Sequence, residues 1–521
     1  MAPFTAERFQ VASSLRATLL LAPILAFACS QEDTRFDTRS YTLRDVVGIG
    51  QYAVFVEQQS AQAYVVHATD PNKTPVRVKL ESNPVVLAKR KGEHEHALVL
   101  CVGSEGSLSE AQSTAGLVVV SEQGAVRRFT WDGNPFDVLD QDASGDYAVL
   151  SQVTSGARLL RNANEVAFIR LDAESNSDEA LRFVTLPAMP QGVVFSSGFK
   201  IAEEDRRLAV VAMEDRIGIV DLEHPAAAPA YVVLNTEPSQ RLWPQQIIFD
   251  GNTSRIYVRA ANADDIFSIR LAEREPPEGK LDFDIAVDII AAGDNPTDLR
   301  TFALDGIQFL AIVADTSRTL ELVDVATSRS TSVRLPEKYD RIHVYENSDD
   351  EGRPHALLWR AEHSALADVP LLDDAQALEQ GLQEYPDLRW GIKEMVEVDS
   401  GTFVFIGDNG LSVLRSASNE LSHYVSGNTR LQDGILDRER GRLWIAPSSQ
   451  SRVAYLDFSQ GSSGELNLDA NIRQALLLPE SGRLLTTHRT IDGYFSSIDV
   501  LSPSRSTTLS IRGFLLAGIL D

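Results

Sequence analysis

Residues 432–445 read QDGILDRERGRLWI, and the same arrangement recurs as QQIIFDGNTSRIYV at residues 245–258 and as RQALLLPESGRLLT at residues 473–486. Each copy has an apolar run, a short polar turn, an arginine and a second apolar run. Apolar runs of this length, bounded by turn residues, are typical of β-strands. The sequence therefore predicts a repeated β-hairpin, and this repeat decides the fold.

A third strand follows each hairpin. Residues 265–271 (DIFSIRL) and 452–457 (RVAYLD) alternate between apolar and polar positions, and so do residues 216–222 (RIGIVDL), which follow a looser copy starting at Arg207. This alternation indicates a strand with one face in the core. About ten such units can be marked between residues 41 and 521, roughly 40 to 60 residues apart, which is near the period of a four-stranded propeller blade.

These units predict an all-β fold, a β-propeller of four-stranded blades. A blade cannot bury both of its faces alone, and radial stacking buries them while protecting the sheet edges. Seven or eight blades are usual for such proteins, so we expect that number, although the chain offers up to about ten units and either one ring or two. The exception is residues 373–384 (DDAQALEQGLQE), where Leu378 and Leu382 share one helical face and acids stand at the start. We predict a short helical insertion there, between blades.

The repeat resembles known families of bacterial propellers. Motifs such as GRLWIA (residues 441–446) and SRIYVR (residues 254–259) are similar to those of the YVTN-type and quinoprotein-like β-propellers, and the resemblance covers roughly residues 41–521. It implies the fold and does not imply one activity, because propellers include lactonases, dehydrogenases, adaptors and binding scaffolds.

The N-terminal part of the chain has the pattern of an export signal. Arg8 and Arg16 precede an apolar run at residues 17–28 (ATLLLAPILAFA), and the chain becomes polar directly after Cys29. A basic start and a short apolar core are typical of such signals, and the run is shorter than the roughly 20 residues that span a membrane.

The cysteine after Ala28 makes this segment resemble a bacterial lipoprotein signal with its lipobox. The resemblance implies that residues 1–28 are removed, that Cys29 receives the lipid, and that residues 29–40 form a tether to a membrane of the bacterial cell envelope. The pattern departs from the lipobox because Leu25 stands one position early and Phe27 stands where a small residue is preferred. Plain secretion and a retained anchor therefore remain alternatives.

Charge and cysteine content narrow the function classes. The 521 residues include 48 Lys and Arg against 74 Asp and Glu, a net charge of −26, which argues against nucleic acid as a partner and against a body that lies on anionic lipid. Besides Cys29 the chain has one cysteine, Cys101, inside the apolar run ALVLCV at residues 97–102. We predict a buried thiol there and no disulfide in the mature domain.

Two motifs have the residue types of metal sites. His94-Glu95-His96 would place two imidazoles on one face of an extended segment, but zinc needs a third and usually a fourth ligand. Residues 140–146 (DQDASGD) match the first half of a calcium loop and lack the acid at its twelfth position. We predict ordinary turns for both, and we expect no metal site, no catalytic residue and no cofactor.

The remaining candidate binding residues are identified by their position within the repeat. Gln245, Gln432 and Arg473 stand at matching places, each ten residues before the repeated arginine. Since the innermost strands of a propeller line its central channel, we predict that these three residues face the channel and bind a partner. Trp243, Trp390 and Trp444 are candidates for aromatic contact area. The repeated arginines (207, 255, 442 and 483) are expected to cap turns or to pair with nearby acids.

The sequence thus predicts a cell-envelope lipoprotein with a non-catalytic propeller scaffold. Its expected partners are the membrane, reached through the lipid, and a protein or polymer bound by the ring. One alternative is a propeller hydrolase or lactonase with a divalent metal at the central channel, which would need several Asp, Glu, Asn or His ligands converging on the axis. A second alternative is a structural subunit of an envelope assembly.

Overall fold

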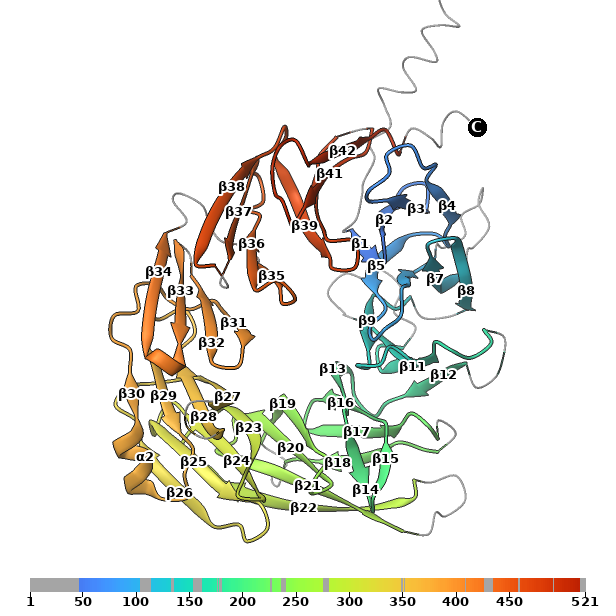
Figure 1. Cartoon of the computed structure of the whole chain (residues 1–521). Coiled ribbons are helices and arrows are strands. Elements are labelled where there is room, and N and C mark those ends of the chain that lie inside the picture. Colours follow the sequence, from blue (N-terminus) through green and yellow to red (C-terminus); the bar gives the residue numbers. More distant parts are fainter. Residues whose placement is uncertain are drawn as a thin grey trace, which may run out of the picture.

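The computed structural model describes residues 46–515, apart from residues 104–113, 133–134, 153–161, 176, 178–179, 225–226, 236–239, 275–280, 348–349, 351, 408, 426–433, 458–459 and 491. Within the described residues there are ten four-stranded antiparallel sheets and one two-stranded hairpin. Figure 1 shows the sheets arranged as blades around a central axis. The predicted all-β propeller is confirmed.

The first five blades use consecutive stretches of chain, and their strands are as follows. Blade 1 has β1 (Val47–Ile49), β2 (Tyr52–Glu57), β3 (Gln62–His67) and β4 (Val76–Lys79); blade 2 has β5 (Pro84–Lys89), β6 (Ala97–Cys101), β7 (Ala115–Ser121) and β8 (Gly124–Trp131); blade 3 has β9 (Val138–Gln141), β10 (Tyr147–Ser151), β11 (Glu165–Arg170) and β12 (Leu181–Thr185); blade 4 has β13 (Pro190–Phe195), β16 (Leu208–Met213), β17 (Arg216–Asp221) and β18 (Ala230–Val233), with the hairpin β14 (Phe199–Ile201) and β15 (Glu204–Arg206) inserted; blade 5 has β19 (Trp243–Asp250), β20 (Arg255–Ala261), β21 (Asp265–Glu273) and β22 (Phe283–Ala291).

The second half of the ring continues in the same way. Blade 6 has β23 (Pro296–Leu304), β24 (Ile307–Ala314), β25 (Thr319–Asp324) and β26 (Ser330–Arg334); blade 7 has β27 (Arg341–Asn347), β28 (Arg353–Trp359), β29 (Leu366–Pro370) and β30 (Gln383–Glu384); blade 8 has β31 (Glu394–Asp399), β32 (Thr402–Ile406), β33 (Gly410–Arg415) and β34 (Glu420–Val425), with the 3₁₀ turn η1 (Ser416–Ser418); blade 9 has β35 (Gly434–Asp437), β36 (Arg442–Ile445), β37 (Arg452–Asp457) and β38 (Ser462–Asn467); blade 10 has β39 (Ile472–Leu478), β40 (Arg483–His488), β41 (Tyr494–Asp499) and β42 (Leu509–Arg512).

The order of strands defines two mouths of the ring. In each blade the strands pair in chain order, and Figure 1 shows the first strands near the axis and the last strands at the rim. Because neighbouring strands are antiparallel, every first strand begins at the same end of the ring. We call that end the start mouth; it also carries the loops between second and third strands. The opposite end, the end mouth, carries the turns between first and second strands and between third and fourth strands.

Ten hydrophobic clusters fill the spaces between consecutive blades, and this explains the blade number. Strand β2 shows how: Ala53 and Phe55 pack toward blade 10, while Val54 and Val56 pack toward blade 2. Each unit therefore has two apolar faces, so each needs a blade on both sides. The ring accordingly uses all of the ten or so units marked in the sequence, which exceeds the seven or eight blades that are usual for such proteins.

Blades 1 and 10 close the ring without exchanging a strand. The backbone N–H of Val46 donates to Gln474 Oε1 at 2.9 Å, and the Phe55 and Phe495 rings stack with their centroids 5.5 Å apart. Gly48 lies so close to blade 10 that a Cβ atom there would be 2.0 Å from Leu478 Cδ2. Closure therefore rests on side-chain packing and a few hydrogen bonds.

The predicted helix is present as α2 (Ala375–Gly381). Asp374 caps it by accepting a hydrogen bond from the N–H of Gln376 at 2.9 Å. Leu378 is buried and Leu382 packs against the same cluster, as predicted. The helix lies between β29 and β30, inside blade 7, so the expectation that it separates two blades is wrong. Among the described helices, none has the length and hydrophobicity needed to cross a membrane.

Candidate functional site

Five innermost strands share a β-bulge one or two residues after they begin. The pairing of β5, β13, β19, β23 and β39 with the next strand shifts register there. The extra residues are Val85, Gln191, Gln245, Thr297 and Arg473, and a proline precedes four of them. A bulge turns its extra side chain away from the regular pleat, and proline is tolerated at the start of a strand. The start mouth thus has a repeated set of redirected side chains near the axis.

Two of the three residues predicted to face the channel occupy these bulges. Gln245 and Arg473 are both exposed, and so is Gln191 at the equivalent place in blade 4. Gln432 lies outside the described residues. The sequence reasoning missed Gln191, although the proline before each of four bulges was a visible signal.

The residue after the bulge forms hydrogen bonds to the neighbouring blade in two of these strands. The Gln246 amide donates from Nε2 to the backbone oxygen of Leu299 in blade 6, at 3.1 Å. Gln474, at the same place in blade 10, accepts from Val46 and donates back to its carbonyl oxygen at 3.4 Å. Each of these bulges thus leaves one side chain exposed at the start mouth and directs the next side chain toward the neighbouring blade.

Asp298 is the centre of a buried network between blades 5, 6 and 7. Asp298 as a whole residue is 4% exposed. Oδ1 accepts from Gln246 Nε2 at 2.6 Å and from Arg300 Nη1 at 2.8 Å, and Oδ2 accepts from the backbone N–H of Ile342 at 3.0 Å. Charge-assisted hydrogen bonds of this kind are stronger than neutral ones. The network fixes the strands that carry the bulge residues.

The repeated arginines pair with acids, as predicted. Arg442 Nη2 lies 2.7 Å from Asp457 Oδ2, and Arg483 Nη2 lies 3.7 Å from Asp499 Oδ2. In both blades the arginine opens the second strand and the aspartate ends the third, directly opposite in the pairing. Arg255 instead pairs with Asp288 at 3.3 Å, in the fourth strand of its blade. These arginines stabilise the blades.

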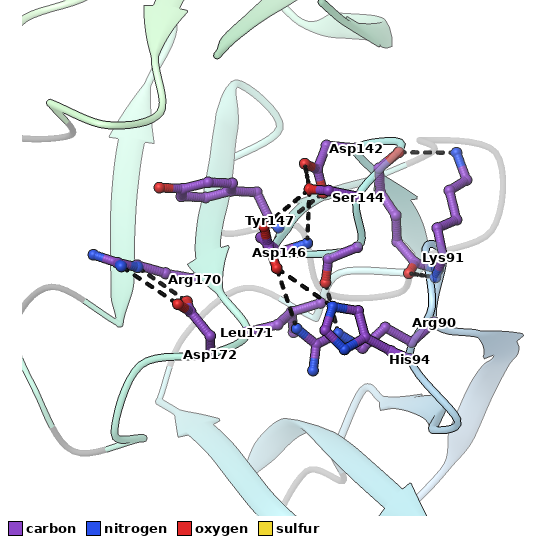
Figure 2. A network of polar contacts seen from close by, with 12 residues as sticks. Arg90, Lys91, His94, Asp142, Ser144, Asp146, Tyr147, Arg170, Leu171 and Asp172 are labelled. Atoms are coloured by element: carbon purple, nitrogen blue, oxygen red, sulfur yellow. Dashed lines mark hydrogen bonds and ion pairs between the residues drawn. The ribbon is translucent and has the colours of Figure 1, made fainter. Parts of the chain in front are cut away.

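The fourth repeated arginine, Arg207, pairs with Asp146 in a polar network that joins blades 2, 3 and 4. Figure 2 shows Asp146 among the residues of blades 2 and 3 in this network. Asp146 Oδ2 accepts from Arg207 Nη1 at 2.6 Å and from Ser144 Oγ at 3.1 Å, while Oδ1 lies 3.4 Å from His94 Nε2 and 3.7 Å from Arg90 Nη2. Burial opposes ionisation of Asp146, but the hydrogen bonds from Arg207 and Ser144 outweigh it, so its pKa is below the usual value.

Both metal-like motifs form turns of this network, as predicted. His94 lies in the turn between β5 and β6, and Asp142 lies in the turn between β9 and β10, where it accepts from the N–H of Tyr147 at 2.9 Å. The two turns touch through glycines: a Cβ on Gly92 would be 2.2 Å from the Ser144 oxygen, and one on Gly145 would be 2.2 Å from the Lys91 oxygen. Within the described residues there is no group of three or more His, Cys, Asp or Glu placed to hold a metal ion.

A cavity of about 280 Å³ lies where the turns after the first strands of blades 10, 1 and 2 meet. Its lining includes the two carboxylates of Glu95 and Glu480. Glu95 receives a hydrogen bond from the N–H of Gly50, and its Oε1 lies 3.0 Å from Lys89 Nζ. Repulsion from Glu95, together with some burial, raises the pKa of Glu480. A proton is therefore held at this joint more tightly than by an isolated glutamate.

We expect this joint to respond to pH. The folded protein binds the Glu480 proton more tightly than the unfolded chain, so the Glu480 contribution to stability is present in acid and is lost as pH rises through the raised pKa. Glu480→Gln should raise the free energy of unfolding in urea slightly at pH 8, by less than about 1 kcal/mol because Glu480 is exposed, and should leave it unchanged near pH 3.5. Glu337→Gln, at an exposed glutamate, is the control. An equal shift at both pH values would contradict the shared proton.

A buried polar trio lies inside blade 7 and was not foreseen. Asp368 Oδ2 accepts from Tyr345 Oη at 3.0 Å and lies 3.1 Å from His355 Nδ1. Burial works against protonation of His355, but Asp368 outweighs it and the His355 pKa is raised. All three residues are buried, so the trio joins three strands of one blade and is closed to substrates.

Four further residues named in the sequence analysis can be placed. Cys101 is buried, as predicted, and burial raises the pKa of its thiol to about 12. Trp444, proposed as contact area, is 0% exposed and packs between blades 9 and 10, so that prediction is wrong. Trp243 and Trp390 are half-buried.

No family model and no curated protein matches the chain. Among solved structures, the dihydro-heme d1 dehydrogenase NirN in complex with DHE has a TM-score of 0.40 at 11% identity, over 86% of this chain and 77% of that one. A eukaryotic initiation factor has a TM-score of 0.44 at 11% identity, over 76% and 90%. Hydrazine synthase of Kuenenia stuttgartiensis has a TM-score of 0.30 at 13% identity, over 49% and 76%. At these TM-scores the overlaps are partial, and they say nothing of what this chain binds.

Proposed function

We propose that this chain is a cell-envelope lipoprotein whose ten-bladed ring is a non-catalytic scaffold for a protein or polymer partner. The observation that carries the proposal is the set of matching bulges at the start mouth. An innermost strand is covered by a blade on each side and by the second strand behind it, so an exposed side chain there is open only toward the axis or the rim of the mouth. Gln191, Gln245 and Arg473 are such side chains.

The supporting structure is stiff where the bulges are. Gln246 and Gln474 tie their strands to the next blade, and Asp298 anchors β23 to both neighbouring blades. Amide and guanidinium groups held on rigid strands recognise backbone carbonyls, carboxylates or sugar hydroxyls at little entropic cost. A partner that offers several such groups would contact several blades at once.

Photo-crosslinking in intact cells tests this surface. A photoreactive amino acid at Gln245 or Arg473 should give a discrete crosslinked product, whereas the same residue at Asp305, a turn residue of the end mouth, should give none. Crosslinking of equal yield from Asp305, or none from either start-mouth position, would contradict a partner at the start mouth.

The membrane tether is tested separately. Cys29→Ala should move the protein from the membrane fraction to the soluble envelope fraction, since the only proposed lipid site is lost. A matched Cys101→Ala variant should stay membrane-bound. If the Cys29→Ala protein sediments with membranes as the wild type does, the lipid anchor is wrong, whatever the crosslinking shows.

A hydrolase with a metal at the axis, and a structural subunit of a larger envelope assembly, remain the alternative hypotheses from the sequence. No contact in the described residues favours either over the scaffold.

A further inference from the structure

A second recess, at the end mouth, opens between blades 3 and 4. Its volume is about 300 Å³. It is lined by residues near the start of β10 and β12, by residues near the end of β11 and β17, and by Leu222, Glu223 and His224 after β17. The recess is the open end of the apolar cluster between these two blades, so its floor is already built from the buried side chains of Tyr147, Phe168, Val220 and Leu222. A recess of this size is at the lower limit for small-molecule sites.

Arg182 is the unusual group in this recess. It stands on β12 directly opposite Phe168, on the face that packs toward blade 4. Its Nη1 donates to the backbone oxygen of Ala227 at 3.1 Å, and among the described residues no carboxylate lies within ion-pairing distance of it. Burial lowers the pKa of Arg182, and no acid of the described part of the chain counteracts this. A guanidinium that is partly desolvated and has no carboxylate beside it among these residues is favourable to an incoming anion.

The other charged groups around the recess are mostly neutralised. Arg170 is paired with Asp172 through two contacts of 2.9 and 3.3 Å, and Figure 2 shows this pair beside Tyr147. Asp221 Oδ2 lies 3.1 Å from His224 Nδ1 and 3.6 Å from Arg206 Nη1. Glu223 is exposed. The pKa of Tyr147 is raised, chiefly by burial; the nearby Arg170 acts to lower it and Glu223 acts to raise it.

From these observations we propose that the recess between blades 3 and 4 binds a small organic carboxylate with an aromatic or aliphatic body. The carboxylate pairs with Arg182, and the apolar body lies on Phe168, Val220 and Leu222. The Tyr147 phenol is available at the same wall to donate a hydrogen bond. This site is on the opposite mouth from the proposed partner surface, and it does not depend on that surface.

The test uses 3-phenylpropionate as the probe, with 3-phenylpropan-1-ol and phenethylamine as neutral and cationic analogues, in calorimetric titration of the purified protein. The propionate should bind at least tenfold more tightly than either analogue, because only it compensates the guanidinium. Equal affinity for the alcohol would overturn the proposal, and so would the absence of any binding at millimolar concentration.

Three variants locate the binding. Arg182→Gln should weaken propionate binding about tenfold or more, because it removes the charge that pairs with the carboxylate. Arg182→Lys keeps the charge and should retain most of the affinity, which separates loss of charge from loss of fold. Arg241→Gln removes an exposed arginine of the start mouth and should change nothing. Loss of affinity in Arg241→Gln, or unchanged affinity in Arg182→Gln, would show that the recess is not the site.

Discussion

Gly145→Ala should be among the most destabilising single substitutions in this ring. Gly145 has a φ of +73°, and its added Cβ would lie 2.2 Å from the backbone oxygen of Lys91 and 2.9 Å from its carbonyl carbon. Neither atom belongs to a flexible side chain, so the turns of blades 2 and 3 must move apart. We expect a loss of about 3 kcal/mol or more, the sum of backbone strain and overpacking. The shift in urea midpoint, followed by tryptophan fluorescence, measures it.

Separation of these turns should also break hydrogen bonds between them. Arg90 Nε donates to the Gly145 oxygen at 2.6 Å, and the Lys91 N–H donates to Gln141 Oε1 at 3.1 Å. Gly198→Ala is the matched control, because Gly198 has a φ of +60° and an added Cβ there would meet no atom within 4 Å. This variant should lose only about 1 kcal/mol of stability, which is the cost of the backbone strain alone. Equal midpoints for the two variants would show that the close approach of the turns is unimportant.

Asp298→Ala should have an effect of similar size for an electrostatic reason. The substitution leaves the Ile342 N–H, the Gln246 amide and the Arg300 guanidinium without their shared acceptor at the centre of three blades. Removing one partner of a buried charged network typically costs about 3 to 5 kcal/mol. Urea unfolding at low and high salt measures the loss, which should depend little on salt because the carboxylate is buried.

The matched control for this variant is Asp288→Ala. Asp288 also pairs with an arginine, Arg255, at 3.3 Å, but its side chain is 58% exposed. An exposed pair contributes less than about 1 kcal/mol and is screened by salt. Asp298→Asn should lie between the two, since the amide keeps one acceptor oxygen. If Asp298→Ala were no worse than Asp288→Ala, the network would not hold the blades.

The fold could be predicted from the sequence because the same physical need recurs in every unit. Two apolar strands and a third alternating strand, with an arginine at a fixed place, describe a blade that must pack on both faces. The number of blades was harder to predict. It depends on whether a weak unit such as residues 52–56 has two apolar faces, and this is evident only when Phe55 and Val54 are seen packing in opposite directions.

The candidate site was less predictable, for reasons that differ between residues. Gln245 and Arg473 were found because they repeat at one spacing, but the bulges that expose them depend on pairing with the next strand. Trp444 was misassigned because an aromatic residue in a strand gives no sign of which face is covered. Arg182 had no local signal, and the motif at residues 140–146 gave no sign that Asp146 pairs with Arg207. The groups that both residues contact in blade 4 are far from them in the sequence.

The closure between blades 1 and 10 has a mechanical consequence. Val46 and Leu515, near the two ends of the described chain, belong to the same hydrophobic cluster. The polypeptide itself crosses every other boundary between neighbouring blades, so only this boundary lacks a covalent link. A pulling force applied through the chain ahead of Val46 would therefore act first on the packing between blades 1 and 10. For the same reason, joining the old ends and cutting a different linker between blades should give a circular permutant with the same ten sheets and a relocated weak point.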